Sequence, residues 1–469
     1  MTVYLSQTDD DEELRMICAA LEMVFRASAK HVKTAFGKVG SSSLPLLLRV
    51  LEQCENNQVK NAEAIMMSVT KTFLIFSRVP DLRAFLARHH GMLDALKRVA
   101  TSNLDVDSRI LRMRVFANLA NCDVNKIIIL KHPGLLESLL RIAALDTSEP
   151  AREYAGLSLM DLASEPENQV PMATVDKLLG TLVKLAIMEK IPETRESAVT
   201  TLQNLAFAKE NRVRLVTYGS GVVLEALKKA VGQDKDSKTR KRAAGALTNL
   251  ACDETGECMG SHKGLLDTLV HVSTRDDNLD VQLRAAMALT KIASCVTCSM
   301  TCHKNILDAL VIASESSHAL SAVVAVMRVK TRDPECRESM AFHPGVLDTL
   351  ADIAVDTKLP LKDRDNAMRA IMHLTNEPHN LKVMCCKKIL SALVVGVAQG
   401  EDEIASSAIT AMERLATEFS NRVHMARHEG LLTAVAMATE REAKLELSDT
   451  SKSLPLLAKP LLLSLLVAM

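Results

Sequence analysis

The feature that most constrains this chain is a short phrase that recurs along it, a turn residue followed by a leucine-rich segment. Clear copies begin at Gly91, Gly134, Gly264, Gly345 and Gly430, and degenerate copies begin at Lys177, Gly221, Asn305 and Lys388. Successive copies start 40 to 44 residues apart. Stacked structural repeats produce a fixed period of this length, whereas a single globular core does not. We therefore expect an array of about nine repeats.

A second phrase follows most of these starts. Its clear copies are Phe116–Ala120, Leu159–Ala163, Leu202–Ala206 and Leu247–Ala251, and its weaker copies are Leu289–Ala293, Ile371–Thr375 and Met412–Ala416. Both phrases space their apolar residues with the helical period. Each unit is predicted to contain a short helix, a sharp bend at the glycine, a second helix, a polar loop and a longer third helix. Glycine suits the bend because it adopts positive φ without steric cost.

The composition favours an all-α fold. Trp is absent and there are three Tyr, whereas Met reaches 22, with 17 Gly and 13 Pro. Strands favour aromatic and β-branched residues and need many turns, and helices favour Leu, Ala, Met, Lys and Glu.

Charge and cysteine content narrow the classes of protein. Lys and Arg number 57, as do Asp and Glu, so no overall field draws the chain to nucleic acid or an acidic membrane. The 11 Cys show no disulfide framework of a small secreted domain, and the polar segment Met1–Asp10 lacks the apolar core of a signal peptide. The apolar run Leu461–Met469 is shorter than the about 20 residues of a membrane-spanning helix. We expect a cytoplasmic or nuclear protein without a transmembrane segment, whose apolar tail caps the array or contacts a membrane.

The two phrases resemble those of the armadillo repeat family. The resemblance rests on the bend glycine, the leucine-rich second helix and the Asn of the third-helix phrase, and it covers the chain from about Leu44 to the mid-430s. It implies a right-handed α-solenoid of about nine three-helix repeats over 44–440, with 1–43 as an N-terminal capping helix and linker and 441–469 as a C-terminal capping segment or tail. HEAT repeats, with two helices, are the competing assignment. The copy at Asn305 departs most, because Ser316–Lys330 lacks the Asn phrase.

The resemblance also implies a site. Armadillo-like proteins bind extended peptides in a concave groove lined by third helices, where a regularly placed Asn bonds the peptide backbone. The matching residues here are Asn118, Asn204 and Asn249, and other residues replace the Asn at Asp161, Lys291, His373 and Arg414. An amide side chain both donates and accepts, so it can serve a main chain of any sequence.

Cations share this predicted face. Arg114, Arg242, Arg284 and Arg369 stand four or seven residues before the Asn position, and Lys291, Arg328 and Arg414 add to them. The interpretation is a scaffold whose basic groove binds acidic or phosphorylated segments of partner proteins. Importin-α-like recognition of lysine-rich cargo is disfavoured, because the chain has no Trp to stack on lysine stems. A solvated polar face without a ligand and an RNA-binding solenoid remain the alternatives.

Other clusters are expected to be structural. Cys295, Cys298, Cys302 and His303 have the residue types of a zinc site, but core or loop thiols are the preferred interpretation. His89, His132, His262, His303, His343 and His428 each precede a second helix by two residues, where a His can cap the first helix. Lys238–Arg242 resembles a nuclear-import signal but is expected to line the groove. No catalytic motif appears, so we expect no enzyme, no cofactor and no small-molecule substrate.

Overall fold

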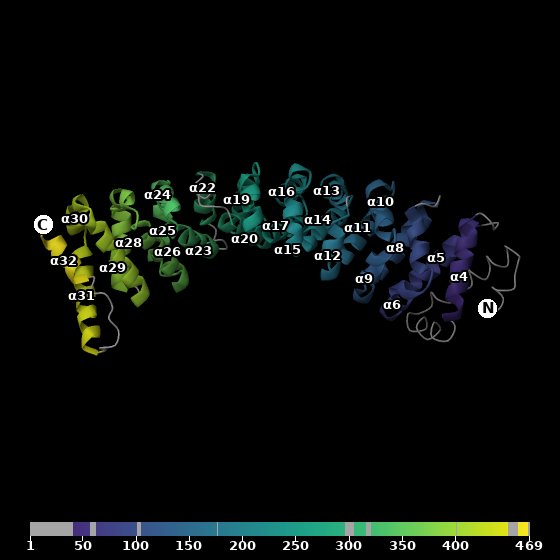
Figure 1. Cartoon of the computed structure of the whole chain (residues 1–469), viewed down its shortest axis with the longest axis horizontal. Coiled ribbons are helices and arrows are strands. Elements are labelled where there is room, and N and C mark those ends of the chain that lie inside the picture. The colour runs from purple at the N-terminus through teal and green to yellow at the C-terminus, as the bar shows by residue number, and fades with distance from the viewer. Residues whose placement is uncertain are drawn as a thin grey trace. The chain divides into compact units, whose positions relative to one another are not determined.

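The structure of the chain is a computed structural model, which describes residues 41–56, 62–100, 105–175, 177–295, 304–315, 320–399, 401–448 and 458–467. Over these residues it contains helices and no strand, which confirms the predicted all-α class (Figure 1). The chain divides into two compact units, Met1–Leu250 (unit 1) and Ala251–Met469 (unit 2). Each unit is a helical repeat array.

Unit 1 opens with a helix pair and continues with four triads of a first, a second and a third helix. The pair is α4 (Ser41–Glu55) and α5 (Ala62–Arg78). The triads are α6 (Pro80–Arg88), α7 (Met92–Lys97) with η2 (Arg98–Ala100), and α8 (Val106–Ala120); α9 (Asp123–Lys131), α10 (Leu135–Leu145) and α11 (Glu149–Ala163); α12 (Pro166–Ala173), α13 (Leu178–Met188) and α14 (Pro192–Leu205); and α15 (Lys209–Thr217), η3 (Tyr218–Ser220) with α16 (Val222–Gln233), and α17 (Ser237–Leu250).

Unit 2 repeats the same order of helices. Its elements are α18 (Asp253–Ser261), α19 (Leu265–Arg275) and α20 (Leu279–Cys295); α22 (Lys304–Ala313) and α23 (Leu320–Thr331); α24 (Pro334–Phe342), α25 (Val346–Val355) and α26 (Leu361–Leu374); η4 (Pro378–Asn380) with α27 (Leu381–Met384), α28 (Lys387–Gln399) and α29 (Asp402–Thr417); and α30 (Phe419–Arg427), α31 (Leu431–Ser448) and α32 (Ala458–Leu466).

Left-handed glycines form the bends between first and second helices, as predicted. Gly91, Gly134, Gly221, Gly264, Gly345 and Gly430 all have φ between 73° and 92°. A residue with a Cβ would be strained there by about 1–2 kcal/mol. The recurring glycine therefore marks a backbone requirement of these six repeats, whereas Lys177 begins α13 with a φ of −88°.

Leucines of the third-helix phrase form the core of unit 1. Leu119, Leu162 and Leu205 are at most 1% exposed, and their helices α8, α11 and α14 pack against one another in chain order. Burying a leucine stabilises the fold by about 2 kcal/mol. Because each third helix buries its apolar stripe against the next repeat, no repeat completes its own core.

A second asparagine series, which the sequence analysis missed, joins successive first helices. The Nδ2 of Asn211 donates to the carbonyl of Gln169 in α12 (3.0 Å) and to the carbonyl of Leu205 at the end of α14 (2.9 Å). The same paired bonds are made by Asn125, Asn168, Asn380 and Asn421. We call these five residues the first-helix asparagines. Their 43-residue spacing from Asn125 to Asn168 to Asn211 was a usable signal.

Salt bridges also join the repeats of unit 1. Each links a third helix to the carboxylate that follows the next second helix: Arg109 to Asp146 (3.0 Å), Arg152 to Glu189 (2.7 Å) and Arg195 to Asp234 (2.6 Å). The three carboxylates are nearly buried, so removal of one partner would leave a poorly solvated charge. These arginines are therefore part of the stack and are not available to a ligand.

The two ends of the described chain can be compared with the boundaries predicted at 43/44 and 440/441. Helix α31 continues through 440, so the boundary expected between 440 and 441 falls inside a helix. Helix α32 packs against α29, α30 and α31 and buries Ala458, Leu461 and Leu465. Residues 1–40, within the predicted N-terminal cap and linker, lie outside the described residues. None of the helices in the described part is long and apolar enough to span a membrane.

Candidate functional site

The candidate site is the face that the third helices present in each unit, which we call the third-helix face. Its reference position lies seven residues before the first-helix asparagine, or its equivalent, of the next repeat. In unit 1 this position holds Asn118, Asp161, Asn204 and Asn249, and in unit 2 it holds Lys291, Val329, His373 and Arg414. The two units therefore differ in chemistry at the same position, which holds no cation in these four repeats of unit 1 and holds the cations Lys291 and Arg414 in unit 2.

The three predicted asparagines of unit 1 lie on this face and are half-buried. Asn118 Nδ2 donates to Ser77 Oγ (2.9 Å), Asn204 Nδ2 to the carbonyl of Met160 (3.4 Å) and Asn249 Nδ2 to the carbonyl of Gln203 (3.4 Å). Each amide thus uses one N–H on the preceding repeat. A long, half-exposed bond of 3.4 Å is weak, so Asn204 and Asn249 keep most of their bonding capacity.

Charges of both signs share the third-helix face of unit 1. Arg114 is half-buried, and Arg242 is exposed with its Nε 3.9 Å from Glu196. Burial raises the pKa of Asp161, and burial followed by the charge of Glu193 raises the pKa of Glu153. From the sequence, Asp161 was named only as a replacement for the Asn, and Glu153 was not named.

The third-helix face of unit 2 bears cations that have no carboxylate partner among the residues that the structure describes. Lys291 is exposed, and Arg284, Arg328 and Arg414 are half-buried. None of these four forms an ion pair with another residue of the described ranges. Exposed apolar side chains lie beside them on α20 and α23, namely Leu283, Met287 and Val329.

Arg369 differs from the other predicted cations because carboxylates already neutralise it. Its Nε lies 2.8 Å from Asp365 Oδ2 and its Nη2 2.5 Å from Glu403 Oε2. The hydrogen bond to Asp365 is the main cause that raises the pKa of Arg369. An acidic ligand would have to displace both carboxylates to pair with Arg369.

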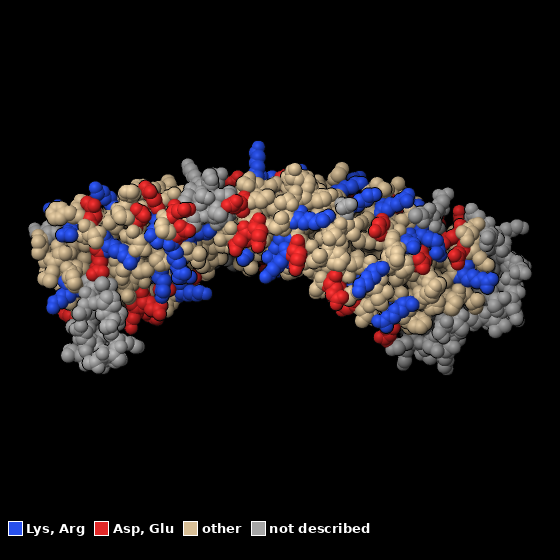
Figure 2. All heavy atoms as spheres, in the orientation of Figure 1, with Lys and Arg blue, Asp and Glu red and all other residues tan. Residues whose placement is uncertain are grey.

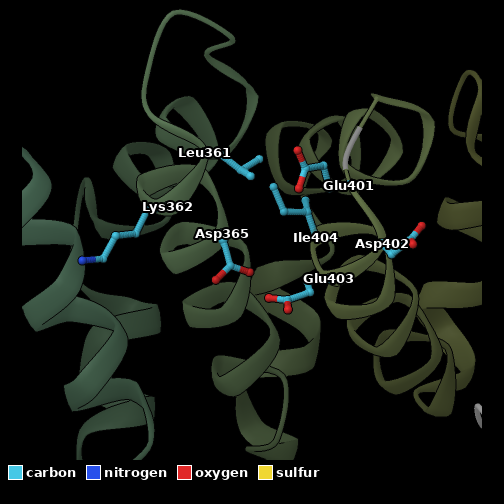
Figure 3. A pocket seen from close by; sticks show the side chains of 7 residues that line it. All are labelled: Leu361, Lys362, Asp365, Glu401, Asp402, Glu403 and Ile404. Carbon is cyan, nitrogen blue, oxygen red and sulfur yellow. The ribbon is translucent and has the colours of Figure 1, made fainter.

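A cleft of about 690 Å³ opens beside these residues, at the starts of α26 and α29. Its lining is acidic and consists of Leu361, Lys362, Asp365, Glu401, Asp402, Glu403 and Ile404. Figure 3 shows Asp365 and Glu403 pointing toward each other, while Lys362 points away. The cleft between the starts of α26 and α29 is therefore lined mainly by carboxylates.

The predicted cysteine cluster falls largely outside the described residues. Cys298, Cys302 and His303 lie there, and Cys295 is a half-buried free thiol at the end of α20. Gly256 of α18 packs against it so closely that an added Cβ would lie 2.5 Å from the Cys295 carbonyl oxygen. In the described part of the chain no group of three or more His, Cys, Asp or Glu is arranged to hold a metal ion.

The histidines before the bends stand at the C-caps of first helices, as predicted for His89, His132, His262, His343 and His428, whereas His303 lies outside the described residues. Three imidazoles also reach the preceding second helix: His132 to Asp94 (3.5 Å), His343 to Asp308 (3.2 Å) and His428 to Ser391 (3.2 Å). Their repetition thus reflects contacts between repeats.

Comparison with known proteins supports the fold alone. No family model and no curated protein matches the chain. The crystal structure of an engineered protein from the Northeast Structural Genomics Consortium matches 88% of this chain and 98% of its own length, with a TM-score of 0.60 and 20% sequence identity. A second engineered protein from the consortium matches 60% of this chain and 96% of its own, with a TM-score of 0.35 and 21% identity. The first likeness shows a shared fold.

Proposed function

We propose that the chain is a non-enzymatic protein-binding scaffold of the armadillo type, with right-handed superhelical repeats. Its third-helix faces bind extended segments of partner proteins in the cytoplasm or nucleus. The observation that carries this proposal is the set of cations on the third-helix face of unit 2, Arg284, Lys291, Arg328 and Arg414, which have no carboxylate partner in the described part of the chain. Cations that no carboxylate neutralises give this face a positive potential, which favours an acidic partner over a basic one.

Apolar side chains on the same face refine the partner's chemistry. Leu283, Met287 and Val329 are 38%, 46% and 49% exposed and lie among the cations of α20 and α23. Apolar side chains at the centre of an interface contribute most of its burial, while a polar rim gives orientation. The partner segment is therefore acidic with interspersed apolar residues.

In unit 1 the proposed contact is with the main chain of the partner. Asn204 and Asn249 each use one N–H on the preceding repeat, and their amide oxygens accept no hydrogen bond within the described residues. An amide oxygen can accept from a peptide N–H of any sequence. Unit 1 would therefore hold an extended segment without selecting its charge.

A charge-reversal experiment tests the proposal. Arg284→Glu combined with Lys291→Glu should weaken binding of an array of acidic peptides to the full chain by about tenfold or more, because each charge-assisted bond contributes about 1.5–3 kcal/mol. Lys358→Glu combined with Lys387→Glu is the matched control, since both lysines are exposed and lie outside the third helices. Equal weakening by both pairs would contradict a specific face.

The same variants also test the alternative that the chain binds RNA. RNA binding that falls steeply with salt and is lost in the Arg284 and Lys291 variant would replace the protein-binding proposal. The chain is poorly equipped for stacking on bases, since it has nine Phe, three Tyr and no Trp. We expect peptide binding to exceed RNA binding at moderate salt.

A further inference from the structure

Four arginines of unit 2 surround one histidine where the end of α23 meets α24, α26 and α29. We call Arg328, Arg332, Arg337 and Arg414, together with His373, the arginine cluster. Figure 2 shows Lys and Arg side chains gathered over the region that Figure 1 labels α23 and α26. Arg332 and Arg337 are not third-helix residues, so the sequence pattern that selected the other cations passed over them.

Hydrogen bonds to backbone carbonyls orient Arg337 within the cluster. Arg337 reaches back from α24, with its Nε donating to the carbonyl of Thr331 (3.0 Å) and its Nη2 to the carbonyl of Arg332 (2.7 Å). The hydroxyl of Thr331 lies 3.3 Å from His373 Nδ1 on the neighbouring third helix. These contacts bring Arg332, Arg337 and His373 to one place and hold the Arg337 guanidinium in a defined direction.

The other two arginines approach from α29 and α23. Arg414 Nη1 donates to the carbonyl of Met372, the residue before His373 (3.0 Å). Arg328 precedes Thr331 by one helical turn, and its Nε is buried with no hydrogen-bond partner among the described residues. The bond to Met372 thus positions Arg414, and the buried Nε of Arg328 remains available for an incoming acceptor.

The electrostatics of the cluster are those of an anion site. Burial lowers the pKa of His373, and the charges of Arg332, Arg337 and Arg328 lower it further. None of the four guanidiniums has a carboxylate within ion-pair distance in the described ranges, whereas Arg195 of unit 1 lies 2.6 Å from Asp234. Carboxylates close to these residues in the sequence include Glu413, whose charge favours the charged form of Arg414, and Asp333, which accepts from the Glu335 N–H. Glu338 of α24 lies 3.9 Å from His379.

We propose that the arginine cluster binds the phosphate group of a phosphorylated serine or threonine in the partner segment, an inference that rests on the proposed function. A phosphate ester carries about −1.5 to −2 charge and three acceptor oxygens at neutral pH. A carboxylate has one charge and two oxygens, which leaves several of the four guanidiniums unpaired. Guanidinium forks bind phosphate oxygens in pairs, and exposed Val329 beside the cluster can contact the neighbouring residue of the segment.

The test compares three peptide arrays that differ at one central residue: phosphoserine, serine or glutamate. The full chain should bind the phosphoserine array at least about tenfold more tightly than the glutamate array, since one additional charge-assisted bond is worth about 1.5–3 kcal/mol. Arg332→Gln, at an exposed position, should remove that preference. Arg427→Gln is the matched control, because Arg427 is also an exposed arginine of unit 2 but lies at the end of α30, outside the cluster.

A second readout uses inorganic phosphate as the probe. In NMR titrations the imidazole of His373, assigned through a His373→Gln variant, should show a raised pKa when phosphate binds, because the anion offsets the surrounding cations. No phosphoserine preference, or a preference that survives in Arg332→Gln, would overturn the inference. If that happens but acidic arrays still bind through Arg284 and Lys291, the scaffold proposal stands and only the phosphate site is rejected. If no array binds, both proposals fail.

Discussion

Replacing the buried Asn211 with alanine should destabilise unit 1 far more than the same change at Asn204 on the third-helix face. Asn211 is 3% exposed, and its amide donates at 3.0 Å and 2.9 Å to two carbonyls of the preceding repeat. Leaving a buried acceptor unsatisfied costs about 1–3 kcal/mol. Since both carbonyls lose a donor, we expect a loss of about 2–4 kcal/mol.

The comparison residue has weaker structural contacts. Asn204 is half-buried and makes one bond of 3.4 Å, so Asn204→Ala should cost less than about 1 kcal/mol. Asn211→Asp is a second useful variant, because it keeps the shape of the side chain but replaces the donor with a carboxylate facing two carbonyls. It should destabilise the unit at least as much as Asn211→Ala.

Repeat arrays need not unfold in one step, so the assay must report locally. Hydrogen exchange of amides in α15, together with urea unfolding followed by circular dichroism, would measure the free energy of opening at this repeat. If Asn211→Ala and Asn204→Ala lower that free energy by the same amount, the structural role assigned to the first-helix asparagines is wrong.

Three further predictions concern the contacts within the units. The hydrogen bond from Arg152 holds the pKa of Glu189 below its ordinary value of 4.5. The stability that this bond contributes is therefore complete above that value and is lost as the pH falls through the lower pKa of the folded state. Urea midpoints measured down to about pH 3 should accordingly fall less in Glu189→Gln than in the parent. Gly256→Ala should cost about 1–3 kcal/mol, because the added Cβ would lie 2.5 Å from the Cys295 carbonyl oxygen. Gly134→Ala should cost about 1–2 kcal/mol through its φ of 74° alone, since the atom nearest to the added Cβ would be 3.5 Å away. Thermal melts would measure both glycine variants, and a Gly256→Ala variant as stable as the parent would contradict the close packing of Gly256 against Cys295.

The repeat length, the helical class and the bends could be predicted from the sequence because each depends on local chemistry. Helices follow from apolar residues spaced with the helical period. The left-handed bends follow from glycine, as Gly91 and Gly430 illustrate with φ values of 86° and 79°. The leucines of the third-helix phrase were recognised for the same reason, and they are buried in unit 1 as the period implies.

Some polar residues stabilise the stack and others remain available to a ligand. Contacts between residues about one repeat apart decide which role each residue has. The sequence assigned Arg369 to the groove, but Glu403, 34 residues later, neutralises it. The same sequence passed over Arg337, which α24 brings back to Thr331 and Arg332 beside His373. Periodicity shows which face of a helix a residue occupies, but the partner that it meets is decided only when neighbouring repeats pack within hydrogen-bond distance.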